Sequence, residues 1–236
     1  MMIMKEIKTI CIITARSGSK GLKDKNIKIL GEMPMLAWPI SAAMKSKFIE
    51  RVILSTDSKE YAEIGIKYGA EIPYLRPREL SHDKSSSMDV LLDLINKLSL
   101  NDKYTHLLLL EPTSPFTEPE DIESALLLLE QNKDAKSVVG IADTGKYHPS
   151  YVVKNNENGF LQPFSSSSFK NMPKRRQDLE PAYFLDGSLY LSEIQTLINE
   201  KSFYHEKTIG IELESYKSHE VDDLEDFKLV QSLLKK

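Results

Sequence analysis

Short apolar runs alternate along the chain with segments whose apolar residues recur at helical spacing. The runs occupy 9–14, 51–56, 105–110, 135–141, 183–191 and 207–213. Helices are predicted at 34–44, 58–68, 87–98, 122–129 and 194–199 and after the acidic stretch 219–226. Over the first 141 residues, near-continuous apolar strands alternate with helices. This pattern predicts an α/β fold with a mostly parallel sheet and helices on both faces.

Polar residues mark the start of two of these helices. Ser86 or Ser87 can cap the helix that follows the serine run. Thr117 with Glu120 forms a capping box, and Pro119 sits in the first turn of that helix. The helix then begins directly after the sequence EPTSP.

Two loops with unusual chemistry follow two of the predicted strands. A glycine-containing loop at 16–28 follows the first strand, and EPTSP at 111–115 follows the most apolar strand, THLLLL. Ligands of parallel α/β sheets bind at the carboxyl ends of the strands. Both loops are therefore expected on one rim of the sheet.

The first loop concentrates positive charge in a chain whose formal net charge is −4. Gly18 and Gly21 allow close backbone approach, so main-chain N–H groups and cationic side chains can together bind phosphate. Neither standard glycine-rich nucleotide motif fits, and a basic surface turn is the alternative. The loop carries Arg16, Lys20, Lys23, Lys25 and Lys28 against Asp24 alone.

Composition limits the classes of protein that remain. With 236 residues the chain fits a single domain, 1–236, with a substantial core. Its single cysteine, Cys11, lies in an apolar strand, so no internal disulfide forms and a reduced, cytoplasmic compartment is expected. No window approaches the length of a membrane span. A mildly acidic balance argues against a nucleic-acid partner.

The alternation of strands and helices stops between 147 and 181. This stretch holds an NENG turn, a serine run and a basic cluster. Phe160, Phe164 and Phe169 give it apolar surface to bury, which favours an inserted dimerisation arm and a homodimer over a flexible surface excursion.

Several motifs together resemble one known family. They are ITARSGSKGLKDKN, LRPRELSHDKSSS, LEPTSP, RRQDLEPAYFLDGSLY and the late HEVDD, in this order. The set resembles the acylneuraminate cytidylyltransferases, also called CMP-sialic acid synthetases, over essentially the whole chain. The resemblance implies a Rossmann-like α/β domain with a protruding dimerisation arm. It also implies a reaction that joins a nine-carbon 3-deoxy-2-keto sugar acid to CMP from CTP.

The resemblance assigns residues to CTP and to catalysis. Arg76 and Ser87 match positions that read the cytosine, and a serine hydroxyl at a helix start can both donate and accept hydrogen bonds. Catalysis is implied for Arg16, Lys25 and Asp222. The first motif matches triphosphate-binding positions at Arg16, Ser19, Lys20, Lys25 and Asn26.

For the sugar acid, the resemblance implies Glu111, Arg176 and Asp186 as substrate-binding residues. Glu220 and Asp222 match a pair of carboxylates that hold the catalytic Mg²⁺, where relatives usually have two aspartates. Acidic residues before a helix also favour its dipole without any metal. No side chain is an obvious strong base, and a metal-bound hydroxyl of lowered pKa can replace one.

The sequence departs from the sialic-acid pattern around the sugar. Phe184 and Asp186 stand where relatives often carry Arg and Asn, Glu111 stands where many have Gln, and Tyr151 falls near a Lys of some relatives. These departures leave a legionaminic or pseudaminic acid open as the substrate. A cytidylyltransferase for an eight-carbon 3-deoxy-octulosonate and a non-catalytic nucleotide-sugar binder are the alternative functions.

Overall fold

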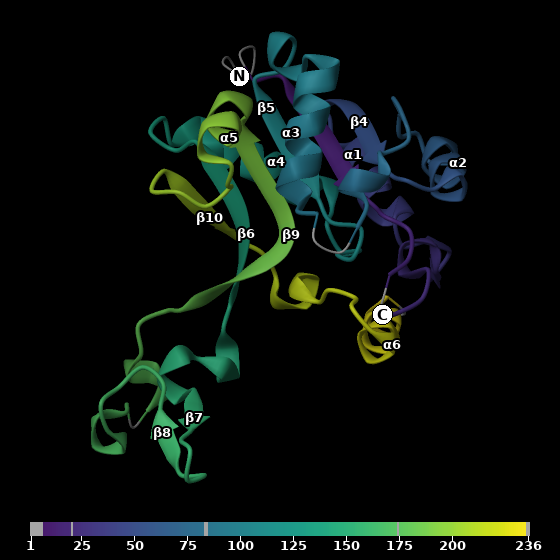
Figure 1. The fold of residues 1–236 in the computed structure, drawn as a ribbon. Coiled ribbons are helices and arrows are strands. Elements are labelled where there is room, and N and C mark those ends of the chain that lie inside the picture. Colours follow the sequence, from purple (N-terminus) through teal and green to yellow (C-terminus); the bar gives the residue numbers. More distant parts are fainter. Residues whose placement is uncertain (1–6, 20, 83–84, 174, 235–236) are drawn as a thin grey trace.

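A six-stranded mixed sheet forms the centre of the protein (Figure 1). The computed structural model describes residues 7–19, 21–82, 85–173 and 175–234. The strand order is β10-β6-β9-β5-β1-β4, in which β9 is antiparallel to β5 and β6 and the other neighbours are parallel. The strands are β1 (Thr9–Thr14), β4 (Ile49–Ser55), β5 (His106–Leu110), β6 (Ser137–Asp143), β9 (Tyr183–Glu193) and β10 (Thr208–Glu212).

The side chains of β1 alternate between two hydrophobic layers. Ile10 and Ile12 pack with α3 and α5, whereas Cys11 and Ile13 pack with α1, α2 and α4 on the other face. Both faces of the sheet are therefore covered, as the apolar strands predict (Figure 1). The helices are α1 (Ala37–Lys45), α2 (Lys59–Lys67), α3 (Ser87–Leu98), α4 (Pro119–Gln131), α5 (Ile194–Glu200) and α6 (Leu224–Leu233). None of the helices in the described ranges is long and apolar enough to cross a bilayer.

A smaller apolar cluster fastens the C-terminal helix to the N-terminal half of the chain. Phe227 and Val230 of α6 pack with Leu30, which lies in the short hairpin of β2 (Ile29–Leu30) and β3 (Met33–Pro34). Val221, just before α6, belongs to the same cluster. The acidic stretch 219–226 is thereby held beside the basic loop after β1 (Figure 1).

The two helix starts differ in how well the sequence predicts them. Ser86 caps α3 in a capping box with Asp89, as expected for the serine run. The predicted box of Thr117 and Glu120 is wrong, because α4 is capped by Glu118 and Asp121 one residue later. The Thr117 hydroxyl instead donates to the carbonyl of Ser114 at 3.4 Å.

Residues 144–182 form an arm that protrudes from the sheet between β6 and β9 (Figure 1). The arm carries its own antiparallel pair, β7 (Val153–Asn155) and β8 (Leu161–Pro163), joined by the predicted NENG turn. Asn156 Oδ1 accepts from the amides of Asn158 and Phe160, and Gly159 has a φ of +80°. The rest of the arm consists of loops and short 3₁₀ turns at 145–147, 149–151, 169–171 and 176–178.

Candidate active site

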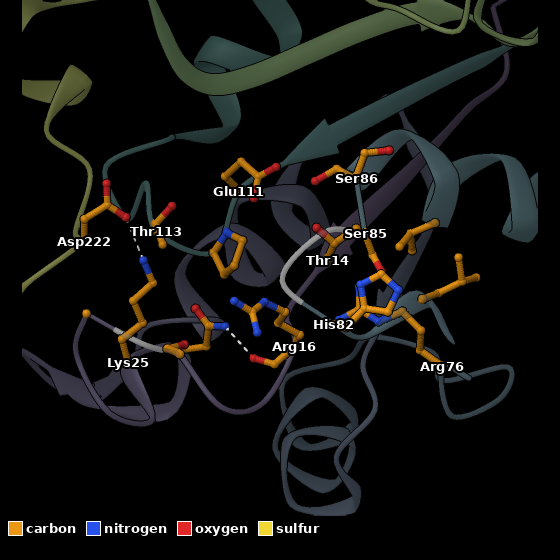
Figure 2. Close-up of a pocket in the computed structure, with 17 residues that line it drawn as sticks. Thr14, Arg16, Lys25, Arg76, His82, Ser85, Ser86, Glu111, Thr113 and Asp222 are labelled. Atoms are coloured by element: carbon orange, nitrogen blue, oxygen red, sulfur yellow. Dashed lines mark hydrogen bonds and ion pairs between the residues drawn. The ribbon is translucent and has the colours of Figure 1, made fainter. Parts of the chain in front are cut away.

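A pocket of about 460 Å³ opens at the carboxyl ends of the central strands (Figure 2). Its walls are the basic loop after β1, the 76–87 loop, the 111–113 loop after β5 and Asp222 from the C-terminal segment. The prediction that the two unusual loops share one rim is confirmed. The predicted residues that line the pocket are Arg16, Ser19, Lys25, Asn26, Arg76, Ser87, Glu111 and Asp222.

The basic loop is fixed at its start by a neighbouring strand. Asp57, just after β4, accepts from the Ser17 amide and from the Ser17 hydroxyl, both at 2.8 Å. Asn26 Nδ2 donates to the carbonyl of Arg16 at 3.2 Å across the loop (Figure 2). A Cβ on Gly21 would collide with the Asp222 carbonyl, so only glycine permits this close approach. The loop therefore presents its cations from a fixed backbone.

Lys25 joins the basic loop to the acidic segment. Its Nζ donates to the carbonyl of Val221 at 2.9 Å and to Asp222 Oδ1 at 2.8 Å (Figure 2). The Lys25 side chain is 16 % exposed and that of Asp222 77 %. The lysine is thus held in place, while the carboxylate stays accessible to a ligand.

Arg76 is a buried cation with unused hydrogen-bond donors. The residue is 7 % exposed, and its Nε and Nη2 have no hydrogen-bond partner within the described residues. Burial lowers the pKa of Arg76, and the neighbouring Arg16 lowers it further, whereas the charges of Asp57 and Glu111 raise it. Buried donors without partners are costly. Their position in the pocket wall therefore indicates a ligand that accepts from them.

The serine run supplies polar groups at the start of α3. The Ser86 hydroxyl is engaged in the capping box with Asp89, and the Ser85 hydroxyl contacts His82 Nδ1 at 3.1 Å. Ser87 is exposed at the first position of α3 and lines the same pocket. Its hydroxyl and the first amides of α3 lie where a polar ring edge could be bound.

Two carboxyl groups near the pocket have raised pKa values. Burial raises the pKa of Glu111 to about 7, and the nearby Glu220 contributes. Burial also raises the pKa of Glu220 to about 7, with further repulsion from Asp222 and Asp186, while Lys25 opposes the shift at both residues. Ionisation of these two carboxyl groups is therefore unfavourable in the unliganded pocket, and a bound cation would favour it.

This edge of the pocket suits a hard divalent cation. Within the described ranges, no three Asp, Glu, His or Cys side chains converge closely enough to form a complete metal site. Mg²⁺ is commonly bound through one or two carboxylates, water and the phosphates of a substrate. Glu220 and Asp222 offer carboxylate oxygens of this kind, and Asp222 is exposed, so the two residues could hold the ion together with a nucleotide.

Two of the predicted residues that the structure describes, Glu220 and Asp186, are not among those that line the pocket. Asp186 is 3 % exposed, and its carboxylate accepts from the amide and hydroxyl of Ser188 at 3.0 and 2.9 Å. Arg176 begins a 3₁₀ turn (Arg176–Asp178) of the arm, which protrudes from the sheet (Figure 1). Lys20 lies outside the described residues. Substrate binding by Asp186 and Arg176 therefore stays a prediction.

Sequence reasoning missed two residues that organise the site. Asp57 accepts hydrogen bonds from Ser17, and its position directly after the RVILST strand could have indicated that it lies at the rim of the pocket. Lys217, buried against Glu118 and Asp121, gave no signal because it looks like any lysine in a charged segment.

Comparison with known proteins agrees with this geometry. Residues 10–236 match the cytidylyltransferase family, and the chain belongs to it. It is 34 % identical to the CMP-N,N'-diacetyllegionaminic acid synthase of Legionella pneumophila, over 97 % of both chains. It is 33 % identical to the N-acylneuraminate cytidylyltransferase of Escherichia coli, of which it spans 52 %. The pseudaminic acid cytidylyltransferase of Campylobacter jejuni is 29 % identical over 97 % of each chain.

Solved structures share the fold. A CMP:2-keto-3-deoxy-manno-octonic acid synthetase complexed with CTP superposes with a TM-score of 0.70 at 16 % identity, covering 97 % of this chain and 98 % of that one. The 4-diphosphocytidyl-2C-methyl-D-erythritol synthase of Anaerococcus prevotii gives 0.66 at 17 % identity, covering 99 % and 98 %. These likenesses establish the architecture of a cytidylyltransferase.

Proposed function

We propose that the protein transfers CMP from CTP to the anomeric hydroxyl of a nine-carbon 3-deoxy-2-keto sugar acid. The observation that carries the proposal is the pocket itself. It combines a fixed cationic loop, a buried Arg76 with unused donors, and carboxylates suited to Mg²⁺ on one rim. A relative that matches over 97 % of both chains is named as a CMP-N,N'-diacetyllegionaminic acid synthase.

The two ends of the pocket would bind different parts of the nucleotide. Arg76 and Ser87, at one end, would hydrogen-bond the cytosine. Arg16 and Lys25, at the other, would neutralise charge that builds on the α-phosphate and on the bridging oxygen. Ser19 and Asn26, from the basic loop, also line the pocket. The protein's task is mainly to position the two reactants and neutralise charge.

In the transfer, the anomeric oxygen forms a bond to the α-phosphorus as the bond to pyrophosphate breaks, and the hydroxyl proton passes to solvent water. The Lys25 ammonium group already donates to Asp222, so it is placed to neutralise the charge of the phosphates beside that carboxylate. When bound by Glu220 and Asp222, Mg²⁺ would supply charge neutralisation at the phosphates and lower the pKa of an oxygen bound to it.

The sugar acid we propose is a deoxy-diacylamino nonulosonate of the legionaminic or pseudaminic type. Phe184, 42 % exposed, removes a cation and adds apolar surface where sialic-acid-using relatives often have Arg. Glu111 adds an acidic group where many have Gln. Together these changes suit a less polar or amino-bearing side chain better than a glycerol tail.

We also propose that the protein is a cytoplasmic homodimer paired through its arms. The arm exposes Phe160 by 70 %, Phe164 by 68 % and Phe169 by 52 %. Arg176 lies on the arm, so it reaches a sugar carboxylate only if the arm meets a pocket of a second copy. A twofold pair supplies that contact twice.

Pyrophosphate release tests the function. The assay contains CTP, Mg²⁺ and, in separate reactions, N,N'-diacetyllegionaminate, pseudaminate, N-acetylneuraminate and an eight-carbon 3-deoxy-octulosonate. We expect release with a diacylamino nonulosonate at the highest kcat/KM. Release with none of them would show a non-catalytic binder, and a preference for the octulosonate would favour the eight-carbon alternative.

A further inference from the structure

A buried lysine precedes the acidic segment of the pocket. Lys217, in the 3₁₀ turn η8 (Ser215–Ser218), is 5 % exposed. Its Nζ donates to Glu118 Oε2 at 2.6 Å and to the two carboxylate oxygens of Asp121 at 2.9 and 2.8 Å. Glu214 Oε2 lies 3.8 Å away. Such a cluster is expensive to bury unless its geometry is good, and here both nearest carboxylates are in direct contact.

The partners of Lys217 lie on the segment that directly follows Glu111, Pro112 and Thr113 of the pocket wall. Glu118 and Asp121 form the first turn of α4, which begins just after the 111–115 loop. Two further contacts join the same two segments. The Val221 amide donates to the carbonyl of Thr113 at 2.9 Å, and the rings of Phe116 and Tyr216 meet edge to face at 5.5 Å. The 216–221 segment is therefore fastened to the 113–121 segment at three points.

The fastened segment carries the carboxylates suited to a cation. Glu220 rests against Gly187, whose φ is +77° and where a Cβ would collide with the Glu220 carboxylate. Asp222 meets Lys25 two residues later. A shift of η8 would move both carboxylates relative to the basic loop, because no regular element separates η8 from them.

We propose that Lys217 is a positioning residue whose ion pairs with Glu118 and Asp121 hold Glu220 and Asp222 where a divalent cation and the nucleotide phosphates meet. The inference rests on the proposed function. Lys217 itself does not line the pocket. It acts through the segment that it fastens, at the end of the pocket opposite Arg76 (Figure 2).

The test compares Lys217→Met with a matched loss of an ion pair elsewhere. Lys136→Met removes the 2.6 Å contact with Glu193 at the amino end of the sheet, away from the pocket. Mn²⁺ binding in the presence of CTP is measured by electron paramagnetic resonance, and CTP binding in EDTA by calorimetry. Because outer partners of metal ligands typically contribute 10-fold to 100-fold in affinity, we expect Lys217→Met to weaken Mn²⁺ binding by about 10-fold.

The same variant should leave CTP binding in EDTA unchanged, since Arg76 and Ser87 are untouched. Lys217→Arg, which keeps the charge, should recover most of the Mn²⁺ affinity, and Lys136→Met should match the wild type. A purely structural lysine would instead lower the melting temperature without changing the Mn²⁺ affinity of the folded protein. That result, or an equal loss in Lys136→Met, would overturn the proposal.

If Lys217→Met does not fold, Glu118→Gln is tested instead. Glu118 is 54 % exposed, and its substitution removes only one of the two ion pairs of Lys217. A smaller loss of Mn²⁺ affinity in that variant supports the proposal, and wild-type affinity refutes it. A wild-type protein that binds Mn²⁺ with CTP but makes no CMP-sugar would disprove the proposed function alone. A wild-type protein that binds no Mn²⁺ would overturn the role of Lys217 as well.

Discussion

The pocket and the arm are held by contacts of different range. At the pocket, Lys25 and Asp222 pair across 197 residues, and Ser17 and Asp57 across 40. In the arm, the turn is closed by Asn156 and Phe160, four residues apart, and the base by Thr144 and Ala182, 38 residues apart. From 152 to 173, all described, Pro163 is the single buried residue. The pocket is thus organised by the fold of one chain, whereas residues 152–173 of the arm have no core of their own.

This difference predicts which changes impair which property. Substitutions in the pocket should change chemistry or nucleotide affinity and leave the state of assembly intact. Substitutions on the exposed face of the arm should change assembly first, and sugar binding through it, while CTP binding is preserved.

The largest effect is expected from Lys25→Met. Loss of one preorganised cation aimed at developing charge typically costs about 100-fold to 1,000-fold in kcat, and we expect a loss in that range. Lys23→Met is the control, because Lys23 lies in the same loop and is exposed. Single-turnover rates at saturating substrates measure both. Equal losses would mean that the overall charge of the loop matters and the Lys25–Asp222 contact does not.

The arm gives the next largest effect. Phe160→Ser combined with Phe164→Ser should convert a dimer into a monomer at micromolar concentration, because two large exposed apolar side chains are lost from each half of the interface. Light scattering measures the mass, and calorimetry measures CTP affinity, which should not change. Tyr204→Ser, at a 45 % exposed aromatic residue of the body, is the control. A monomeric wild type would refute the proposed dimer.

The sequence predicts the two regions unequally, and the reasons are physical. The sheet and its helices follow from Ile10 and Ile12 alternating with Cys11 and Ile13, since a doubly covered strand needs apolar residues on both faces. The rim follows because carboxyl ends of parallel strands share an edge. Strand order does not follow: nothing in the apolar pattern of β9 places it antiparallel between β5 and β6.

Side-chain contacts between residues far apart along the chain could not be predicted from the sequence either. Lys217 meets Asp121 across 96 residues, so no local pattern reveals that this lysine is buried. The start of α4 was misplaced by one residue because Thr is a favoured N-cap and Glu is not, whereas the Thr117 hydroxyl donates to the Ser114 carbonyl and Glu118 caps the helix. Arg176 was expected at the sugar, and its place on the arm leaves that role a prediction.

A third, smaller effect concerns the choice of nucleotide. Arg76→Lys should narrow the preference for CTP over UTP by roughly 10-fold, because a planar fork with two unused donors is replaced by a point charge. Arg78→Lys, on an exposed residue of the same loop, is the control. Competition between the two nucleotides gives the ratio of kcat/KM values. If the ratio stays at its wild-type value in both variants, Arg76 does not read the base.

The smallest expected effect is on the free energy of unfolding. It tests the cost of ionising the buried Glu111 carboxyl beside Glu220. The pKa of Glu111 is raised from 4.5 to about 7 in the folded protein, so the folded state keeps a proton that the unfolded chain has lost. Stability should therefore fall as pH rises from about 4.5 to 7 and stay reduced above that range. Below about pH 4.5 the carboxyl is protonated in both states and contributes no penalty.

Glu111→Gln removes this titration, so the variant should melt higher than the wild type at about pH 8 in EDTA and at nearly the same temperature close to pH 4.5. A difference of a few degrees is expected, since about 1 kcal/mol shifts the melting temperature of a chain of this size by roughly 2–4 °C. Glu63→Gln, at an exposed residue of α2, should show no such pH dependence. If Glu111→Gln destabilises the protein equally at both pH values, the Glu111 carboxylate is stabilised by Lys25 and Arg76 more than it is repelled by Glu220. The negative edge of the pocket would then be balanced without a cation.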